Sequence, residues 1–372
     1  MPDRLKRRMI QALYKRRTQG TFRRPFDGAA SRRLLLLAVD HSIPQSQLFP
    51  FHYHAKAFRD RLDVGIRQLP VDGHLDVSLL KRSTTICFQT SFDISDEALT
   101  TLISTIRTHN PDAQLVYLHW FAPTDLRLAA RIGPLVDAYV SKHLLRDRRQ
   151  YGEPTYGDTT LMEYYGRSFD LQHDVMEFSI PKGFMEKLYL GPSFATADFM
   201  LPAFDHDSIP VSPRAIDLHA RIAKQGTPWY HAMRQASADA VNALEGVRCA
   251  TGFGIRHGLF LRELRNSKIC FSPFGYGEVC WRDYEAILCG AVLLKQDMSH
   301  VATEPDIFRP SETYVPVKWD LSDFEEQVRW LLSDASARQR IARNAYEVLQ
   351  DYARTARFTQ QMTPALFPDA AQ

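Results

Sequence analysis

Apolar runs alternate with helix-like segments along the first half of the chain. The run at 32–40, RRLLLLAVD, has the continuous apolar character of a strand buried on both faces, and shorter runs follow at 84–89 and 114–119. Segments with helical spacing of apolar residues, at 51–62 and 96–108, separate these strands. The order strand, helix, strand predicts right-handed crossovers and a doubly wound parallel sheet.

The second half shows the same kinds of pattern, after a stretch with weak periodicity. Residues 151–191 predict loops with a short helix, and three prolines within 199–213 predict a linker between domains. The other predicted elements are helices at 214–224, 228–244, 322–332 and 335–353, and strands at 246–254 and 313–317.

Length and composition fit a soluble α/β protein. A chain of 372 residues suggests two domains, and 45% hydrophobic with 24% charged residues is ordinary for a globular protein. The loop after the first predicted strand contains no glycine, and the chain has neither GxGxxG nor a Walker A sequence, which argues against a dinucleotide-binding oxidoreductase. The five cysteines lie mostly in apolar runs without metal-ligand spacing, so we expect reduced thiols.

The most informative stretch, FSPFGYGEVCWRDYEAILCGAVLL at 271–294, predicts a strand, a glycine-containing loop, a helix over 278–289 and a second strand. The backbone at Gly275 and Gly277 can approach a ligand closely, and the start of a helix attracts phosphate. Arg282 and Glu285 are three residues apart and share a helix face next to this loop. A cation and a carboxylate there suit a diphosphate and ribose hydroxyls.

This stretch resembles the donor-binding motif of exostosin-like glycosyltransferases and, more loosely, that of other transferases with the GT-B fold. The resemblance covers about 25 residues and is carried by Gly275, Tyr276, Gly277, Trp281, Arg282, Glu285, Ala286, Leu288 and Gly290. It implies a GT-B fold, in which two Rossmann-like doubly wound domains face a cleft. It also assigns Glu285 to the donor ribose. The chain departs from the common retaining pattern, because six residues rather than seven separate Glu278 from Glu285.

The resemblance and the pattern together predict five segments. These are a basic amphipathic segment at 1–30, an acceptor-binding domain at 31–200, a linker at 201–213, a nucleotide-sugar-binding domain at 214–350 and a C-terminal helix at 351–372 that crosses back to the first domain.

Each candidate site residue has a functional and a structural interpretation. The predicted donor-binding residues are Phe274, Gly275, Tyr276, Gly277, Arg282, Glu285 and Arg256; the predicted catalytic bases, placed after strand ends, are Asp125 and His41. Glu285 and Arg282 are alternatively a solvated helix pair, and the aromatic residues are alternatively an apolar lining.

The amino terminus is strongly basic although the net charge is only +3. Residues 1–33 carry eleven Lys or Arg against Asp3 and Asp27, with apolar residues at helical spacing. Such a helix suits an anionic membrane surface, and a solvated basic arm is the equal alternative. Nucleic acid is a less favoured partner because no supporting motif accompanies the charge. No signal peptide or long apolar run is present, so we expect a cytoplasmic protein, peripheral at the inner face of a membrane.

The sequence therefore predicts a glycosyltransferase that moves sugar from a nucleoside diphosphate sugar to a glycan or lipid-linked acceptor, in cell-envelope or capsular polysaccharide assembly. We expect no cofactor and no bound metal. Two alternatives stay open: a nucleotide-sugar epimerase of similar fold, and a noncatalytic scaffold that binds membrane or RNA.

Overall fold

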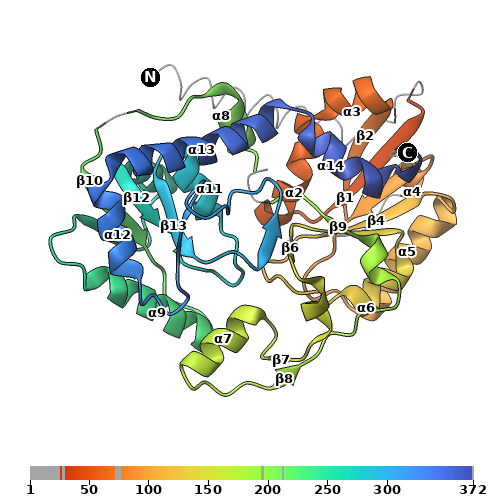
Figure 1. Ribbon diagram of the computed structural model, residues 1–372. Helices are drawn as coiled ribbons and strands as arrows, with labels where there is room; N and C mark the ends of the chain where they lie inside the picture. The colour runs from red at the N-terminus through yellow and green to blue at the C-terminus, as the bar shows by residue number, and fades with distance from the viewer. Residues whose placement is uncertain (1–25, 27–29, 72–76, 194–196, 212, 371–372) are drawn as a thin grey trace.

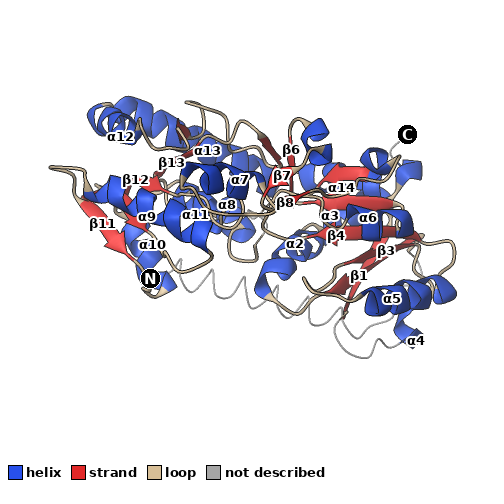
Figure 2. Cartoon of the chain, turned by 90° about the horizontal axis from the view of Figure 1, so that it is seen from below, coloured by secondary structure: helices blue, strands red, loops and turns tan. Residues whose placement is uncertain are grey.

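Two separate parallel β-sheets, one in each half of the chain, organise the structure (Figure 1). The computed structural model describes residues 26, 30–71, 77–193, 197–211 and 213–370. The predicted basic segment at 1–30 lies almost entirely outside the described residues. Figure 2 shows the two groups of strands apart from each other, each flanked by helices. The chain is thus a mixed α/β protein with two doubly wound units.

The first sheet has six strands in the order β2-β1-β3-β4-β5-β9, all parallel. Its strands are β1 (Arg32–Ala38), β2 (Val64–Pro70), β3 (Thr85–Phe88), β4 (Gln114–His119), β5 (Ala138–Ser141) and β9 (Leu188–Leu190). Successive leucines of β1, from 34 to 37, are all fully buried, because helices cover both faces of the sheet. This is the arrangement that the continuous apolar run predicts.

The helices of the first unit mostly follow the predicted spacing. They are α2 (Ser42–Tyr53), α3 (Ala55–Leu62), α4 (Val77–Leu80), α5 (Asp96–His109) and α6 (Ala129–Ile132), with 3-10 turns at Gly133–Leu135, Arg148–Gly152 and Phe184–Lys187. Ser95 caps α5 by accepting a hydrogen bond from the Ala98 amide, and Asp96 and Glu97 occupy its first turn, where the helix dipole favours negative charge.

The second sheet has five parallel strands in the order β11-β10-β12-β13-β15. Its strands are β10 (Ile216–Arg221), β11 (Cys249–Gly252), β12 (Ser267–Phe271), β13 (Val292–Gln296) and β15 (Val315–Val317). The predicted helix at 214–224 is wrong, because this segment forms β10 between two other strands. Leu218, Ala220 and Ile222 alternate along it and pack into one core, which is the period-two signal of a strand.

The helices of the second unit surround this sheet. They are α9 (Pro228–Asn242), α10 (His257–Arg265), α11 (Trp281–Leu288), α12 (Phe324–Ser333) and α13 (Ala335–Arg354). In the part of the chain that the structure describes, no helix combines the length and the apolar character needed to cross a bilayer.

Several connections hold the two units together. β6 (His143–Leu145) of the first unit pairs antiparallel with β14 (Val301–Thr303) of the second. The predicted linker contains a short helix, α8 (Leu201–His206), against which α13 packs. The last helix, α14 (Arg357–Leu366), lies on the first sheet, where Thr85 and Gln114 donate hydrogen bonds to its carbonyls (Figure 1).

The segment at 151–191 extends from the first unit to the second. It forms the two-stranded sheet of β7 (Thr155–Tyr156) and β8 (Val175–Met176), with α7 (Thr160–Ser168) between them. α7 packs against α9, and the Tyr165 hydroxyl donates to the Trp319 carbonyl at 3.2 Å. This segment belongs to the first unit by sequence, yet it contacts the second, so it spans the space between them (Figure 1).

Candidate active site

The loop between β12 and α11 is fixed by a buried carboxylate. α11 begins at Trp281, three residues later than the helix predicted from the sequence, with Cys280 as its N-cap. Asp283 is fully buried; it accepts hydrogen bonds from the Cys280 amide at 2.8 Å and the Ser272 hydroxyl at 2.6 Å, and pairs with Lys295 at 3.2 Å. Because these contacts tie the loop to both neighbouring strands, its shape is preorganised.

Three of the predicted donor-binding residues in this loop have protein neighbours. Phe274 is fully buried, and its ring stands edge-on to Trp319 at 5.2 Å between centroids, so it is a core residue in this structure. At Gly277 an added Cβ would lie 1.9 Å from the Ala122 carbonyl oxygen of the first unit. The close neighbour of this glycine is therefore protein backbone. At Gly275 an added Cβ would lie 3.4 Å from the Cys280 sulfur.

Tyr276 is the exposed residue of this loop, with 43% of its surface accessible. Its ring stacks on Tyr230 at 4.4 Å between centroids and 11° between planes. Its hydroxyl accepts a hydrogen bond from the Thr227 amide at 3.1 Å, at the start of α9. The loop after β12 and the loop after β10 are thus joined at the carboxyl edge of the sheet, where α/β proteins bind ligands.

The guanidinium of Arg282 has unused hydrogen-bond donors within the described part of the chain. Its Nε and Nη1 atoms are buried and have no hydrogen-bond partner among the described residues, and its guanidinium lies 5.8 Å from the centroid of the Phe260 ring. Buried N–H groups without a partner are costly, and a guanidinium matches the geometry of phosphate oxygens. The geometry therefore fits an anion.

Two further basic side chains lie near Arg282, of which Arg234 adds to the positive potential. Arg234 is buried and donates hydrogen bonds to the backbone carbonyls of Pro273 and Phe274, at 3.1 and 2.8 Å. Burial and the nearby charge of Arg282 both lower the pKa of Arg234. Burial, and then the charge of Arg282, lower the pKa of His219 to about 4. A bound anion would relieve this repulsion.

Glu285 does not pair with Arg282 in the described contacts, although the two share a helix. Its carboxylate lies 2.6 Å from Nε2 of His257, the first residue of α10. The hydrogen bond to Glu285 raises the pKa of His257 above its ordinary value, against the opposing effect of burial. Arg256 is exposed at the N-cap of the same helix, next to this pair.

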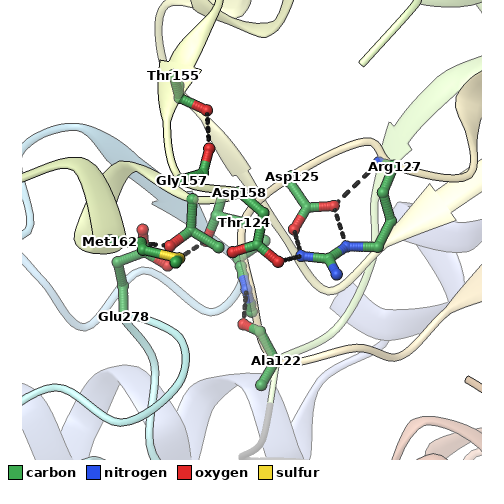
Figure 3. A network of polar contacts seen from close by, with 11 residues as sticks. Ala122, Thr124, Asp125, Arg127, Thr155, Gly157, Asp158, Met162 and Glu278 are labelled. Carbon is green, nitrogen blue, oxygen red and sulfur yellow. Dashed lines mark hydrogen bonds and ion pairs between the residues drawn. The ribbon is translucent and has the colours of Figure 1, made fainter. Parts of the chain in front are cut away.

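The predicted base Asp125 is held by a neighbouring arginine (Figure 3). Arg127 donates to both of its carboxylate oxygens, at 2.8 and 2.6 Å. Burial raises the pKa of Asp125, and the hydrogen bonds from Arg127 oppose that rise. The same guanidinium reaches Asp158 at 3.3 Å, and the Asp158 side chain is 39% exposed. Asp158 is therefore the more accessible carboxylate of the two.

The other predicted base, His41, lies at the start of α2. It is exposed, and its Nδ1 accepts a hydrogen bond from the Ile43 amide at 3.4 Å, so it acts as the N-cap of the helix. Its role as a base stays a prediction.

Glu278, in the loop between β12 and α11, contacts the first unit. It is almost completely buried and accepts a hydrogen bond from the Thr124 hydroxyl of the first unit (Figure 3). Nε2 of His300 lies 3.6 Å from its other carboxylate oxygen. Burial would raise the pKa of Glu278, but His300 and the nearby His143 hold it below its ordinary value. Glu278 is therefore an internal ionised group at the interface of the units.

A cavity of about 770 Å³ opens between the units. Residues after β3 and β4, the segment at 158–173, the start of α9 and Tyr276 line it. Its aromatic residues are Phe92, Trp120, Phe121, Trp229 and Tyr276, and its charged residues include Arg127 and Asp158. A volume of this size accommodates a small organic ligand.

The predicted site residues do not all meet at this cavity. Among them only Tyr276 lines it, whereas Arg282 and Glu285 face α10 on another side of α11. Sequence reasoning missed Arg127, Asp158 and Arg234. The strand-end rule that pointed to Asp125 also applies to Arg127, two residues later. Asp158 and Arg234 gave no signal, because the first lies in a segment without periodicity and the second resembles a surface arginine of a helix.

Comparison with known proteins relates this arrangement to solved structures. No family model and no curated protein sequence matches the chain significantly. An α-glucosyltransferase solved with UDP is similar at a TM-score of 0.53 and 10% identity, covering 92% of this chain and 100% of its own. An α-glucosyltransferase with UDP-glucose and DNA containing an abasic site has a TM-score of 0.53 and 9% identity, covering 91% and 99%.

The chain has the GT-B fold. Two parallel sheets with helices on both faces, arranged around a cavity, match these glucosyltransferases over nearly the whole length. The predicted fold class is confirmed. The finer resemblance to exostosin-like transferases is not confirmed and stays a prediction.

Proposed function

We propose that this protein transfers a sugar from a nucleoside diphosphate sugar to a hydroxyl group. The observation that carries the proposal is the partly buried guanidinium of Arg282, whose buried Nε and Nη1 atoms have no partner among the described residues, with Arg234 close by. A diphosphate bound there would satisfy these donors and balance the charge. Solved proteins of the same fold that contain UDP or UDP-glucose support this choice of ligand.

The donor is held by the loop and by the first turn of α11. Arg282 and the N-terminal amides of this helix bind the diphosphate, which the helix dipole also attracts. Glu285 accepts hydrogen bonds from the ribose hydroxyls, and His257 orients its carboxylate. Tyr276, also predicted to bind the donor, lines the cavity between the units instead of facing Arg282 and Glu285, so it takes no part in the donor site proposed here. No cofactor beyond the donor enters the proposal.

The acceptor approaches from the first unit. Asp158 is the carboxylate that lies at the cavity and remains partly exposed, so it accepts the proton of the acceptor hydroxyl in an inverting reaction. The acceptor oxygen then forms a bond to the anomeric carbon while the bond from that carbon to the phosphate oxygen breaks. The electron pair leaves with the nucleoside diphosphate, whose growing charge Arg282 stabilises.

The biological setting is a second part of the proposal. Assembly of cell-envelope or capsular glycans on a lipid-linked acceptor rests on the basic residues at 1–33, which favour an anionic membrane surface. One of the similar structures contains DNA. Nucleic acid therefore belongs among the acceptors to be tested, together with glycans and lipid-linked sugars.

Thermal unfolding with a panel of nucleotides tests the donor site. A ligand that binds only the folded state raises the melting temperature, so UDP or another nucleoside diphosphate should stabilise the wild type. The same nucleotide should stabilise Arg282→Gln far less. If no nucleotide or nucleotide sugar stabilises the wild type, the proposed function is wrong.

A further inference from the structure

We propose that the cavity between the units binds a flat, apolar ring that belongs to the acceptor and lies next to the reacting hydroxyl. This inference rests on the proposed function, because it names the substrate class of the acceptor side of the same enzyme. It is carried by the aromatic walls of the cavity, by the mostly apolar character of its accessible lining and by the position of Asp158.

The aromatic residues of the cavity present ring faces and edges. Phe92 and Phe121 lie 4.8 Å apart and Trp120 lies 4.9 Å from Phe121, between ring centroids, so they form one continuous wall. The Trp120 indole N–H donates to the Thr90 carbonyl at 2.8 Å. Because the indole N–H already has a protein partner, Trp120 presents apolar surface to a ligand.

The opposite wall has the same character. Trp229 stands edge-on to Tyr276 at 5.9 Å between centroids, and the Tyr276 hydroxyl bonds to the Thr227 amide. Phe92 is 57% exposed and lines the cavity, so its ring is accessible to a ligand there. A flat ring between these walls would make offset or edge-to-face contacts with both.

Most of the accessible surface that lines the cavity is apolar, although Thr159, Gln172, His173 and Thr227 also line it, and this argues against a free saccharide. A sugar exposes a hydroxyl at almost every carbon, and each hydroxyl needs a hydrogen-bond partner when it leaves water. Much of the donor capacity of Arg127 is already taken, because it is bonded to Asp125 at two points and also reaches Asp158. Asp158 is thus the charged group best able to receive a hydroxyl, which fits a ring with one reacting O–H.

The segment at 155–173 positions this carboxylate. Asp158 follows Gly157, which has a φ of +89°. A Cβ added at Gly157 would lie only 2.5 Å from the Met162 side chain, so this position requires glycine. The Thr155 hydroxyl donates to the Gly157 carbonyl at 2.9 Å (Figure 3). The Thr159 side chain caps α7 by accepting a hydrogen bond from the Met162 amide. These contacts fix the turn, which places Asp158 in the lining of the cavity beside its aromatic walls.

The ring belongs to the acceptor rather than to the donor base. Most of the wall comes from the first unit and the segment at 158–173, whereas the proposed diphosphate and ribose ligands, Arg282 and Glu285, do not line the cavity. The experiment below distinguishes the two sources, because a donor base in the cavity would make UDP binding depend on its walls.

Calorimetric titration with 2-naphthol, a flat ring with one hydroxyl, tests the proposal on the full-length protein. Titrations are run with and without UDP, and methyl α-glucoside serves as the saccharide probe. Phe92→Ser removes an exposed ring at the cavity, Phe92→Tyr retains it, and Phe253→Ser removes a similarly exposed ring, 54% accessible, outside the cavity.

We expect 2-naphthol to bind the wild type and Phe253→Ser equally and Phe92→Ser about three- to tenfold more weakly, the value of one aromatic contact. Phe92→Tyr should bind normally, UDP affinity should be the same in all four proteins, and methyl α-glucoside should bind weakly. Equal 2-naphthol affinity in Phe92→Ser and wild type overturns the proposal. A parallel loss of UDP affinity overturns it too, by assigning the cavity to the donor base. If UDP fails to bind the wild type, the donor site is wrong, while the titration without UDP still decides the cavity.

Discussion

The α-carbon of Gly277 lies so close to Ala122 that a Cβ on the glycine would be 1.9 Å from the Ala122 carbonyl oxygen. The two residues belong to different units, and neighbouring Glu278 and Thr124 are hydrogen-bonded across the same boundary. The absence of a side chain at Gly277 therefore permits the units to approach each other. The sequence suggested that a ligand comes close at this glycine, whereas the structure shows a backbone there.

Gly277→Ala should destabilise the protein by roughly 1–3 kcal/mol, the usual range for overpacking, because the Ala122 backbone cannot move away as a flexible side chain would. The matched control is Gly275→Ala, whose new methyl group would meet the Cys280 sulfur at 3.4 Å, close to ordinary contact. Urea unfolding measures both. Equal stability of the two variants would show that the units are not held at this distance in solution.

Arg282→Gln should weaken UDP binding at least about tenfold without lowering the stability of the free protein. The substitution removes a positive charge whose Nε and Nη1 atoms have no partner among the described residues, so unfolding free energy should stay constant or rise. Arg262→Gln, at an exposed position of α10, is the control for loss of charge. Calorimetry and urea unfolding give both quantities. A variant that is less stable but binds UDP normally would make Arg282 a structural residue.

The pair of His257 and Glu285 should make stability depend on pH. The hydrogen bond to Glu285 raises the pKa of folded His257 above 6.5, the value of an unperturbed histidine. The stabilisation is therefore complete below about 6.5 and is lost as pH rises through the higher folded value. Urea unfolding at about pH 6 and about pH 8.5 should show this loss in the wild type and a smaller one in Glu285→Gln. NMR titration of His257 should give a higher pKa in the wild type than in Glu285→Gln; equal values would contradict the pairing.

Asp125 and Asp158 should differ in the consequences of the same substitution. Asp125→Asn removes the carboxylate that binds Arg127 at two points, so it should lower stability by about 1–3 kcal/mol. Asp158→Asn affects a single ion pair with a partly exposed carboxylate and should leave stability nearly unchanged. If the reaction inverts, Asp158→Asn should also reduce kcat by about 100-fold or more, with a small effect on KM for the donor. Full activity in Asp158→Asn would remove it as the base.

Much of the fold could be predicted because burial on both faces leaves a strong local pattern. The leucine run of β1 and the glycine-containing stretch around α11 are such cases. The sequence pattern predicts a helix in place of β10, because the alternation of Leu218, Ala220 and Ile222 is too short to distinguish a strand from a helix. The segment at 151–191 could not be assigned, since its structure depends on packing against the second unit, for example between Tyr165 and Trp319.

The candidate site was predictable only where it is local in sequence. Arg282 and Tyr276 lie within one sequence motif. In the structure, the buried Nε and Nη1 atoms of Arg282 have no partner among the described residues, and Tyr276 is exposed. The contact of Glu285 with His257, 28 residues earlier, depends on how α10 packs beside α11. Likewise, Arg127 and Asp158 meet only because the loop after β7 folds over the end of β4, which no sequence pattern shows.

Product analysis with a donor labelled in its sugar tests the central claim most directly. The protein is incubated with UDP-sugars carrying a 13C-labelled anomeric carbon, together with glycan, lipid-linked, aromatic and nucleic-acid acceptors, and 13C and 31P NMR follow the label and the diphosphate. The account predicts that UDP is released as the labelled carbon enters a new glycosidic bond, and that Arg282→Gln slows both changes together. Label that remains on UDP in an epimerised sugar, with no release of UDP, would contradict it.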